Sequence, residues 1–173
     1  MKTRNHFLCA VMGALLLVIA SCKYTNKYET INAGNQFSVS IPDWMKEDKK
    51  LKDGAVFQYA NHFRNFYVIG ETISKSDLKR TTAELMNDNL NVLKKSLTNG
   101  VVTDSVEVTT PNLKGTRIEI YGKMGGENIY FSEALYEGNK NIYHLSVWTR
   151  SEDRKLHFKD DISRIIGSVR EIN

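Results

Sequence analysis

The sequence predicts an α+β fold, an α/β/α sandwich in which helices cover both faces of an antiparallel sheet. Strand-like runs stand before and after one long helical stretch, and two-residue turns join several of them as hairpins. A late strand, residues 142–149, is apolar on both sides: Tyr143 and Leu145 point one way, Ile142 and Trp148 the other. Burial on both sides requires a covering layer on each face of the sheet.

The chain begins with a segment, residues 1–21, that has the composition of a signal peptide. Lys2 and Arg4 precede an uncharged apolar run at 7–20, which is shorter than the roughly 20 residues that a spanning helix needs. The run ends in the sequence IASC, which resembles the lipobox of bacterial lipoproteins. This resemblance implies that the sulfur of Cys22 takes a diacylglycerol and that the signal is then removed.

Two other interpretations of this segment are an ordinary signal peptide with a chance cysteine and a short uncleaved anchor. Its length, charge, small residues and cysteine together favour the lipoprotein. Residues 22–27 would then be the lipidated cysteine and a tether that reaches about 15–20 Å. Lys23 replaces the Asp that retains lipoproteins in the inner membrane, so the resemblance favours the outer membrane, facing the periplasm.

Residues 28–173 are expected to form a single domain. Removal of the signal leaves 22 Lys and Arg against 20 Asp and Glu, so the net charge falls from +4 to +2. Such a small excess does not indicate a nucleic-acid partner. The two cysteines are Cys9, lost with the signal, and Cys22, used by lipid, so neither a disulfide nor a thiol nucleophile is expected.

The first half of the domain alternates strand-like runs with turn residues. Asn, Gly and Pro mark the turns, and the charged run at 46–53 is expected to be a solvated loop. The predicted strands are 28–31, 37–41, 55–60 and 66–73.

A helix follows these strands. Thr81 and Glu84 form a capping box, in which each residue satisfies a free backbone donor of the other. Gly100 is expected to close the helix with a left-handed residue. One apolar stripe follows at helical spacing: Met86, Leu90, Leu93 and Leu97.

The second half predicts strands at 101–109, 116–124, 129–136 and 142–149. A Gly125–Gly126 hairpin should place Ile120 opposite Phe131 and Tyr121 opposite Tyr130. A last helix is expected to start at Ser151 and to end near Gly167. Its apolar stripe is Phe158, Ile162, Ile165, Ile166 and Val169.

Four features of the chain resemble the PsbP-like superfamily, over residues 28–172. They are the sequence FSVSIP at 37–42 with Trp44 shortly after, the capped helix, the Gly125–Gly126 hairpin and the closing sequence IIGSV. The superfamily consists of α/β/α sandwiches and includes extrinsic subunits of the photosynthetic oxygen-evolving complex and a nuclear-import factor that binds Ran. The resemblance implies a binding or accessory domain, and it carries over no functional residue.

Few residues suggest chemistry. His62, His144 and His157 lack the spacing of a zinc site, so neither a metal nor a cofactor is expected. The sequence contains no nucleophile elbow or phosphate-binding loop. His144 in a central strand is expected to be a hydrogen-bonded side chain that is buried or half-buried. One candidate surface is the row Tyr121, Tyr130, Tyr136 and Trp148, which would either line a pocket or form core beneath a helix.

These observations favour a lipid-anchored binding or accessory module of the cell envelope that is not an enzyme. It would contact the membrane through the lipid on Cys22 and an envelope protein or component through its domain. One alternative is a small hydrolase with a dispersed site near His144, which needs an acid and a hydroxyl close to that ring. Another is a carrier of a small apolar ligand between sheet and helix.

Overall fold

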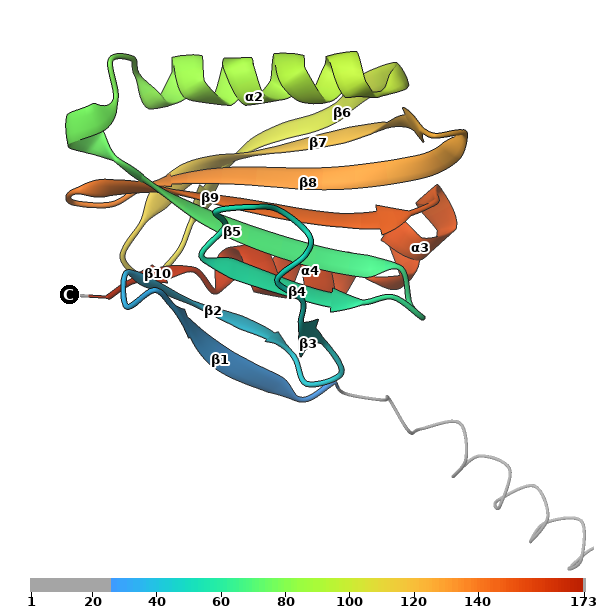
Figure 1. Ribbon diagram of the computed structural model, residues 1–173, viewed down its shortest axis with the longest axis horizontal. Helices are drawn as coiled ribbons and strands as arrows, with labels where there is room; N and C mark the ends of the chain where they lie inside the picture. The colour runs from blue at the N-terminus through green and yellow to red at the C-terminus, as the bar shows by residue number, and fades with distance from the viewer. Residues whose placement is uncertain (1–25, 173) are drawn as a thin grey trace, which may run out of the picture.

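A seven-stranded antiparallel sheet organises the domain, with the strand order β3-β4-β5-β9-β8-β7-β6 (Figure 1). The computed structural model describes residues 26–172, so the predicted signal peptide, Cys22 and most of the tether lie outside the described residues. Its strands are β3 (Lys46–Glu47), β4 (Phe57–Asn61), β5 (Phe66–Ser74), β6 (Thr98–Thr109), β7 (Lys114–Met124), β8 (Glu127–Glu137) and β9 (Asn141–Arg150).

A second, smaller sheet was not predicted as a separate element. It has the order β1-β2-β10, and its strands are β1 (Tyr28–Ala33), β2 (Phe37–Pro42) and β10 (Arg170–Glu171). β10 pairs with the start of β2, so the first and last strands of the described chain belong to the same sheet and flank β2. A two-residue strand such as β10 has no detectable periodicity, so it could not be predicted from the sequence.

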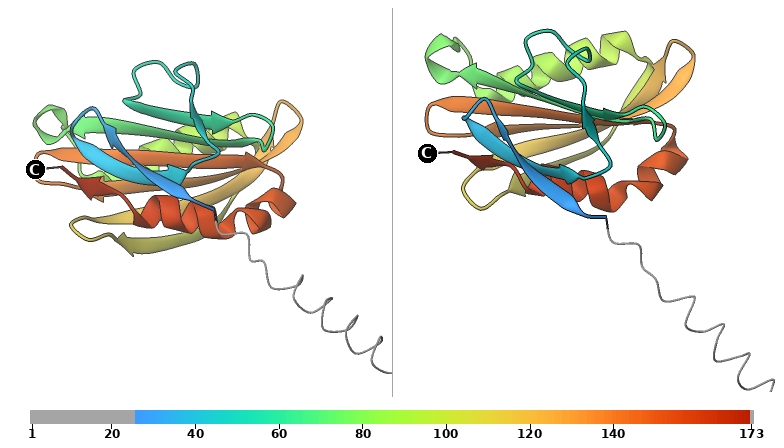
Figure 2. Two further views of the ribbon diagram at one scale, coloured as in Figure 1. Left: turned by 90° about the horizontal axis from the view of Figure 1, so that it is seen from below. Right: turned by 60° about the horizontal axis from the view of Figure 1, so that its bottom comes forward.

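Helices cover both faces of the large sheet, as predicted. They are η1 (Lys75–Asp77), α2 (Thr82–Ser96), α3 (Glu152–His157) and α4 (Lys159–Gly167). α2 lies on one face, whereas α4 and the small sheet share the other (Figure 2). None of the helices in the described part of the chain is both long and apolar enough to span a bilayer.

The main core lies between the large sheet, α4 and the small sheet. It joins strand residues such as Phe37, Phe66 and Val147 with Ile165 and Ile166 of α4. Complete burial of such side chains contributes about 1.5–3 kcal/mol each. Two smaller apolar clusters lie on the α2 face.

The β7–β8 hairpin has the predicted register. Ile120 lies opposite Phe131 and Tyr121 opposite Tyr130. The turn residues Gly125 and Gly126 have φ angles of 58° and 85°. Positive φ at both central turn positions matches the twist of the strands and favours glycine there.

The capping box of α2 is present, but its predicted end is wrong. Thr81 and Glu84 cap each other's backbone, and the helix ends at Ser96 instead of continuing to Gly100. Leu97 is buried against β7 and β8 residues, and a side chain at Gly122 would meet the Leu97 Cβ at 2.9 Å. This close packing draws the chain directly into β6, where Gly100 lies.

The last helix is broken into α3 and α4, whereas the sequence predicted one helix. The break falls at Phe158, which has φ −99° and ψ 11°. Its buried ring packs against Phe66 at 4.8 Å and Trp44 at 5.8 Å between centroids. Tertiary packing of this ring therefore overrides the helical periodicity. Ser151 precedes α3, but its side chain makes no capping hydrogen bond.

Candidate functional site

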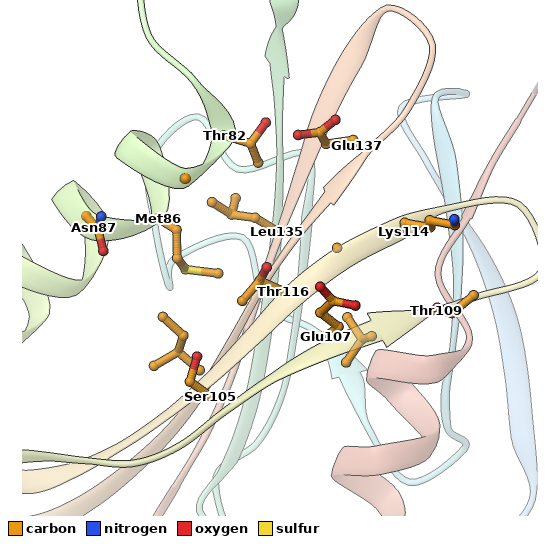
Figure 3. Close-up of a pocket in the computed structure, with 14 residues that line it drawn as sticks. Thr82, Met86, Asn87, Ser105, Glu107, Thr109, Lys114, Thr116, Leu135 and Glu137 are labelled. Atoms are coloured by element: carbon orange, nitrogen blue, oxygen red, sulfur yellow. The ribbon is translucent and has the colours of Figure 1, made fainter.

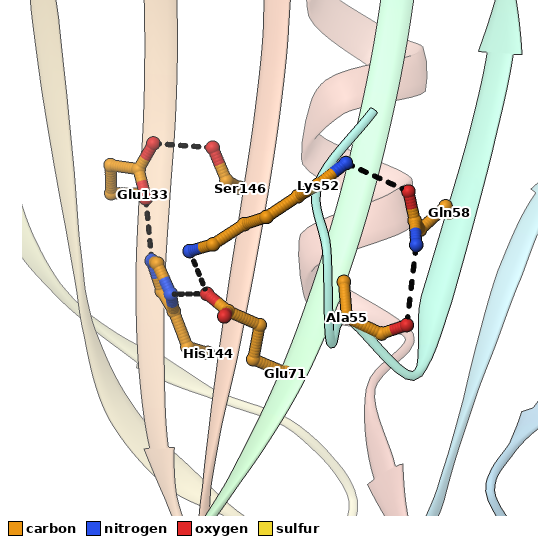
Figure 4. Close-up of polar contacts among 7 residues, drawn as sticks. All are labelled: Lys52, Ala55, Gln58, Glu71, Glu133, His144 and Ser146. Carbon is orange, nitrogen blue, oxygen red and sulfur yellow. Dashed lines mark hydrogen bonds and ion pairs between the residues drawn. The ribbon is translucent and has the colours of Figure 1, made fainter. Parts of the chain in front are cut away.

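Three neighbouring strands place a polar cluster on the α2 face of the large sheet (Figure 4). β5 and β9 align Glu71 with His144, and β8 and β9 align Glu133 with Ser146. The His144 Nδ1 lies 3.1 Å from a Glu71 oxygen, and its Nε2 lies 2.6 Å from Glu133. The Ser146 hydroxyl donates to the other Glu133 oxygen, and Lys52 Nζ lies 2.6 Å from Glu71.

The cluster shifts the pKa values of its members. Burial lowers the pKa of His144, but its contacts with Glu133 and Glu71 outweigh that effect and raise the pKa to about 9. The contact with His144 lowers the pKa of Glu71 to about 2, with a further contribution from Lys52. His144 is therefore an imidazolium at neutral pH, and it donates to one carboxyl group on each side.

This arrangement holds charges in place and offers little for nucleophilic chemistry. A serine nucleophile needs a neutral base that accepts its proton. The Ser146 hydroxyl is bonded to Glu133 instead of His144, and both His144 nitrogens are already engaged. Within residues 26–172, no set of three or more His, Cys, Asp or Glu side chains is arranged to hold a metal ion.

A groove of about 200 Å³ runs over this cluster, between α2 and the loop that contains Lys52. Trp148 forms its aromatic end and is stacked between Tyr67 and Phe131, with centroid distances of 5.2 and 5.8 Å. Val92 lines the groove from α2, and its residue surface is 68% exposed. The groove thus has a charged end and an aromatic end.

A larger cleft, of about 620 Å³, lies under the first half of α2 (Figure 3). Its floor is apolar and consists of Met86, Ile118 and Leu135. Its rim is polar and carries Glu107, Glu137, Lys114, Thr82, Asn87, Ser105, Thr109 and Thr116. An apolar floor beneath a few polar groups is typical of a binding site for an amphipathic ligand or a protein segment.

The predicted aromatic row is not one surface. Tyr130 and Tyr136 are buried in the main core, and Tyr121 packs against the same core. Trp148 projects from the opposite face, because its partner across the strands is Phe131. Grouping Trp148 with the three tyrosines was therefore wrong, since the alternation of β9 sends it the other way.

The buried tyrosines fasten the sheet to the last two helices. The Tyr136 hydroxyl donates to the Ile166 carbonyl oxygen over 2.7 Å, and Lys155 Nζ lies 4.4 Å from the centre of the Tyr130 ring. Burial raises the pKa of both phenols well above their ordinary value. These tyrosines hold α3 and α4 against the large sheet.

The other two histidines lie apart from the cluster. His62 is exposed and lies 2.8 Å from an Asp48 oxygen, and His157 is exposed on α3. The sequence did not reveal Glu71, Glu133 and Lys52 as neighbours of His144. One signal was present: Glu133 is the only charged residue in the buried stretch 129–136 of β8, and a buried acid requires a partner.

This geometry defines the chain as an α+β domain of the PsbP/Mog1-like fold. No protein-family model and no curated protein sequence matches it. Among solved structures, cyanobacterial PsbP (CyanoP) from Synechocystis sp. PCC 6803 superposes with a TM-score of 0.63. It is 10% identical, over 87% of this chain and 96% of CyanoP.

Two further structures share the fold. The Ran-binding protein Mog1p of Saccharomyces cerevisiae has a TM-score of 0.58 and 9% identity, over 86% of this chain and 97% of Mog1p. LpqN, involved in cell envelope biogenesis of Mycobacterium tuberculosis, has a TM-score of 0.57 and 10% identity, over 85% of this chain and 91% of LpqN. At these identities the comparisons show the fold alone.

Proposed function

We propose that this protein is a lipid-anchored accessory module of the cell envelope, which binds a protein or another envelope component and is not an enzyme. The cleft under α2 carries this proposal, because it offers an apolar floor inside a charged rim. The structural neighbours support it, since one is a Ran-binding protein and another takes part in envelope biogenesis. A fold alone does not identify a function, so the proposal rests on the site.

The anchor is the lipid on Cys22, and the location is the outer membrane, facing the periplasm. Several acyl chains hold a protein firmly, because each buried methylene contributes about 0.8 kcal/mol. Labelling with palmitate should mark the wild-type chain and leave Cys22→Ala unlabelled. A wild-type chain without label would contradict the anchor.

The cleft and the start of the described chain lie on opposite sides of the large sheet. Figure 1 shows α2 on one side of the large sheet and the start of the described chain beside β1 on the other. A short tether therefore leaves the α2 side open to a partner that approaches from the periplasm. Both signs of charge stand on the rim, with Lys114 opposite Glu137 in the β7–β8 register, and they suit a polypeptide partner.

A substitution that fills the cleft tests the proposed contact. Thr116 points into the cleft from β7, so Thr116→Trp should reduce capture of partners from detergent-solubilised envelopes at least tenfold. Thr103→Trp is the matched control, because Thr103 is exposed on β6 and lines a different hollow. Both variants should keep the wild-type melting profile. Repeated failure of the wild-type chain to capture any partner would contradict the proposal.

A carrier of a small apolar ligand is the second candidate, favoured by the Met86, Ile118 and Leu135 floor. Native mass spectrometry of the protein purified from envelopes separates the two candidates. A carrier shows an added small mass in the wild type that Thr116→Trp removes. Apo protein alone, together with captured protein partners, supports the accessory module.

A further inference from the structure

A second hollow, of about 680 Å³, lies where the described chain begins. The β4–β5 turn, α3, α4 and the start of β1 surround it. We call it the tether-end surface, and it is formed by Asn26, Tyr28, Phe63, Arg64, Arg154 and Arg164. None of these residues belongs to the α2 cleft or to the His144 cluster.

Three arginines line this surface. Arg64 lies over the Trp44 ring at 4.6 Å, and Arg164 lies over the Tyr28 ring at 3.9 Å. Arg154 donates to the Arg64 carbonyl oxygen over 2.9 Å. Among the side chains that the structure describes, which exclude that of Glu152, none of the three forms an ion pair with a carboxylate. Their guanidinium groups are therefore free to meet an external anion.

Two acids also line the hollow, and they differ in burial. Asp161 is buried and accepts hydrogen bonds from Asn26 Nδ2 at 2.8 and 3.0 Å and from the Tyr28 hydroxyl. Asp160 is exposed. Its hydrogen-bond partners are neutral, so Asp161 keeps its charge, and three arginines face two acids on this surface.

Phe63 stands at the tip of the β4–β5 turn, and its residue surface is 92% exposed. Its neighbour Arg64 belongs to the arginine group. A large apolar ring that projects among cations is the arrangement of proteins that bind a bilayer interface.

The chain itself brings this surface to the membrane. Asn26 is fixed on Asp161 and follows Cys22 by four residues, which reach about 14 Å when fully extended. A lipid on Cys22 therefore holds the tether-end surface next to the headgroups. No other face of the domain has the same short connection.

We infer that the tether-end surface docks on an anionic phospholipid bilayer, with Phe63 in the interfacial layer and Arg64, Arg154 and Arg164 against headgroup phosphates. This inference rests on the proposed lipid anchor. It adds an orientation: the domain lies against its membrane with the α2 cleft turned outwards. Arginine suits the contact because its planar fork binds phosphate oxygens in pairs.

The test uses the acylated full chain, reconstituted in vesicles of phosphatidylethanolamine and brominated phosphatidylglycerol at three to one. The indole of Phe63→Trp should lose at least half of its added fluorescence, because bromine quenches only on contact. Val92→Trp is the matched control, since Val92 is exposed on α2, and its indole should stay unquenched. Equal quenching of both variants, or of neither, overturns the docking.

A second arm tests the charges. Combining Phe63→Trp with Arg64→Gln, Arg154→Gln and Arg164→Gln should weaken docking about 100-fold, since each basic residue near an anionic surface contributes about fivefold. Replacing the exposed Lys94, Lys95 and Lys123 with Gln removes the same charge and should change nothing. Retained docking in the arginine variant overturns the inference. So does a Phe63→Trp indole that is protected in native envelopes but not on vesicles, since that result indicates a protein partner.

Failure of the anchor and failure of the docking are separable. The mass of the Cys22 peptide shows whether the cysteine is acylated. The quenching of the Phe63→Trp indole shows whether the tether-end surface contacts the bilayer. An unacylated peptide with strong quenching on added vesicles contradicts the anchor and supports the docking. An acylated peptide without quenching contradicts only the docking.

Discussion

The two faces of β9 differ in the side chains that they bury: one is apolar and the other is polar. Tyr143, Leu145 and Val147 enter the dry core that α4 and the small sheet cover. His144 and Ser146, between those residues in sequence, enter a polar cluster on the α2 face. Strand alternation thus separates a stabilising face from one that keeps polar groups and hollows.

The difference follows from how each face is covered. α4 and the small sheet pack over the centre of the large sheet and fill it with aliphatic and aromatic side chains. α2 packs mainly over β6 to β8, and the loop that contains Lys52 borders part of β5 and β9. A loop excludes water less completely than a helix, so charged side chains remain tolerable there. We therefore expect stability to depend mainly on the α4 face and binding on the α2 face.

The largest expected effect concerns the α4 face. Phe66→Ala should lower the free energy of unfolding by about 3–5 kcal/mol, because Phe66 is fully buried between Trp44 and Phe158. Val92→Ala, at an exposed position of α2, should change it by less than about 0.5 kcal/mol. Urea unfolding measures both. A similar loss of unfolding free energy in the two variants would contradict the expectation that stability depends mainly on the α4 face.

The next effect concerns the charged cluster and depends on pH. The pKa of His144 is raised to about 9 from 6.5, so its contribution is complete below pH 6.5 and disappears as the pH rises through 9. The pKa of Glu71 is lowered to about 2, so its contribution is complete above pH 4.5 and is lost as the pH falls towards 2. The cluster should stabilise the fold most near pH 5.5.

His144→Gln tests this dependence. The stability advantage of the wild type over this variant should shrink by about 2–3 kcal/mol between pH 6 and pH 9.5. Thermal or urea unfolding across this range measures it. The matched control His157→Gln, at an exposed position, should follow the wild-type profile. A constant difference across the range would show that folding does not raise the pKa of His144.

The smallest effect concerns the attachment of α2. Thr81→Ala removes one half of the capping box and should cost about 1 kcal/mol. Amide exchange in the first turn of α2, above the cleft, should accelerate about fivefold. Ser151→Ala is the matched control, because the Ser151 side chain makes no capping bond. An equal loss in both variants would show that the box does not hold the helix over the cleft.

Local signals in the sequence were reliable where neighbouring residues determine the structure. The Gly125–Gly126 turn predicted the register of β7 and β8, and the Thr81–Glu84 box predicted the start of α2. Predictions failed where a distant contact decides. Leu97 ends α2 early because it packs on the sheet, and Phe158 breaks the last helix because it packs on Trp44 and Phe66.

The candidate site also has a part that the sequence predicts and a part that depends on distant contacts. The sequence placed His144 on a central strand, but Glu71 lies 73 residues earlier and Glu133 eleven residues earlier. Their meeting depends on strand order, which periodicity does not encode. The same holds for Phe63 and Arg154, whose turn and helix join beside the start of β1 only in the folded chain.

The α+β class, the strand alternation and the turn and cap positions can be predicted from the chain alone, because they follow from backbone sterics and hydrogen bonds between near neighbours. Which side chains share the cluster, the cleft and the tether-end surface depends on how the elements pack. These sites are made by segments far apart in the chain, and burial of the common core is what brings them together.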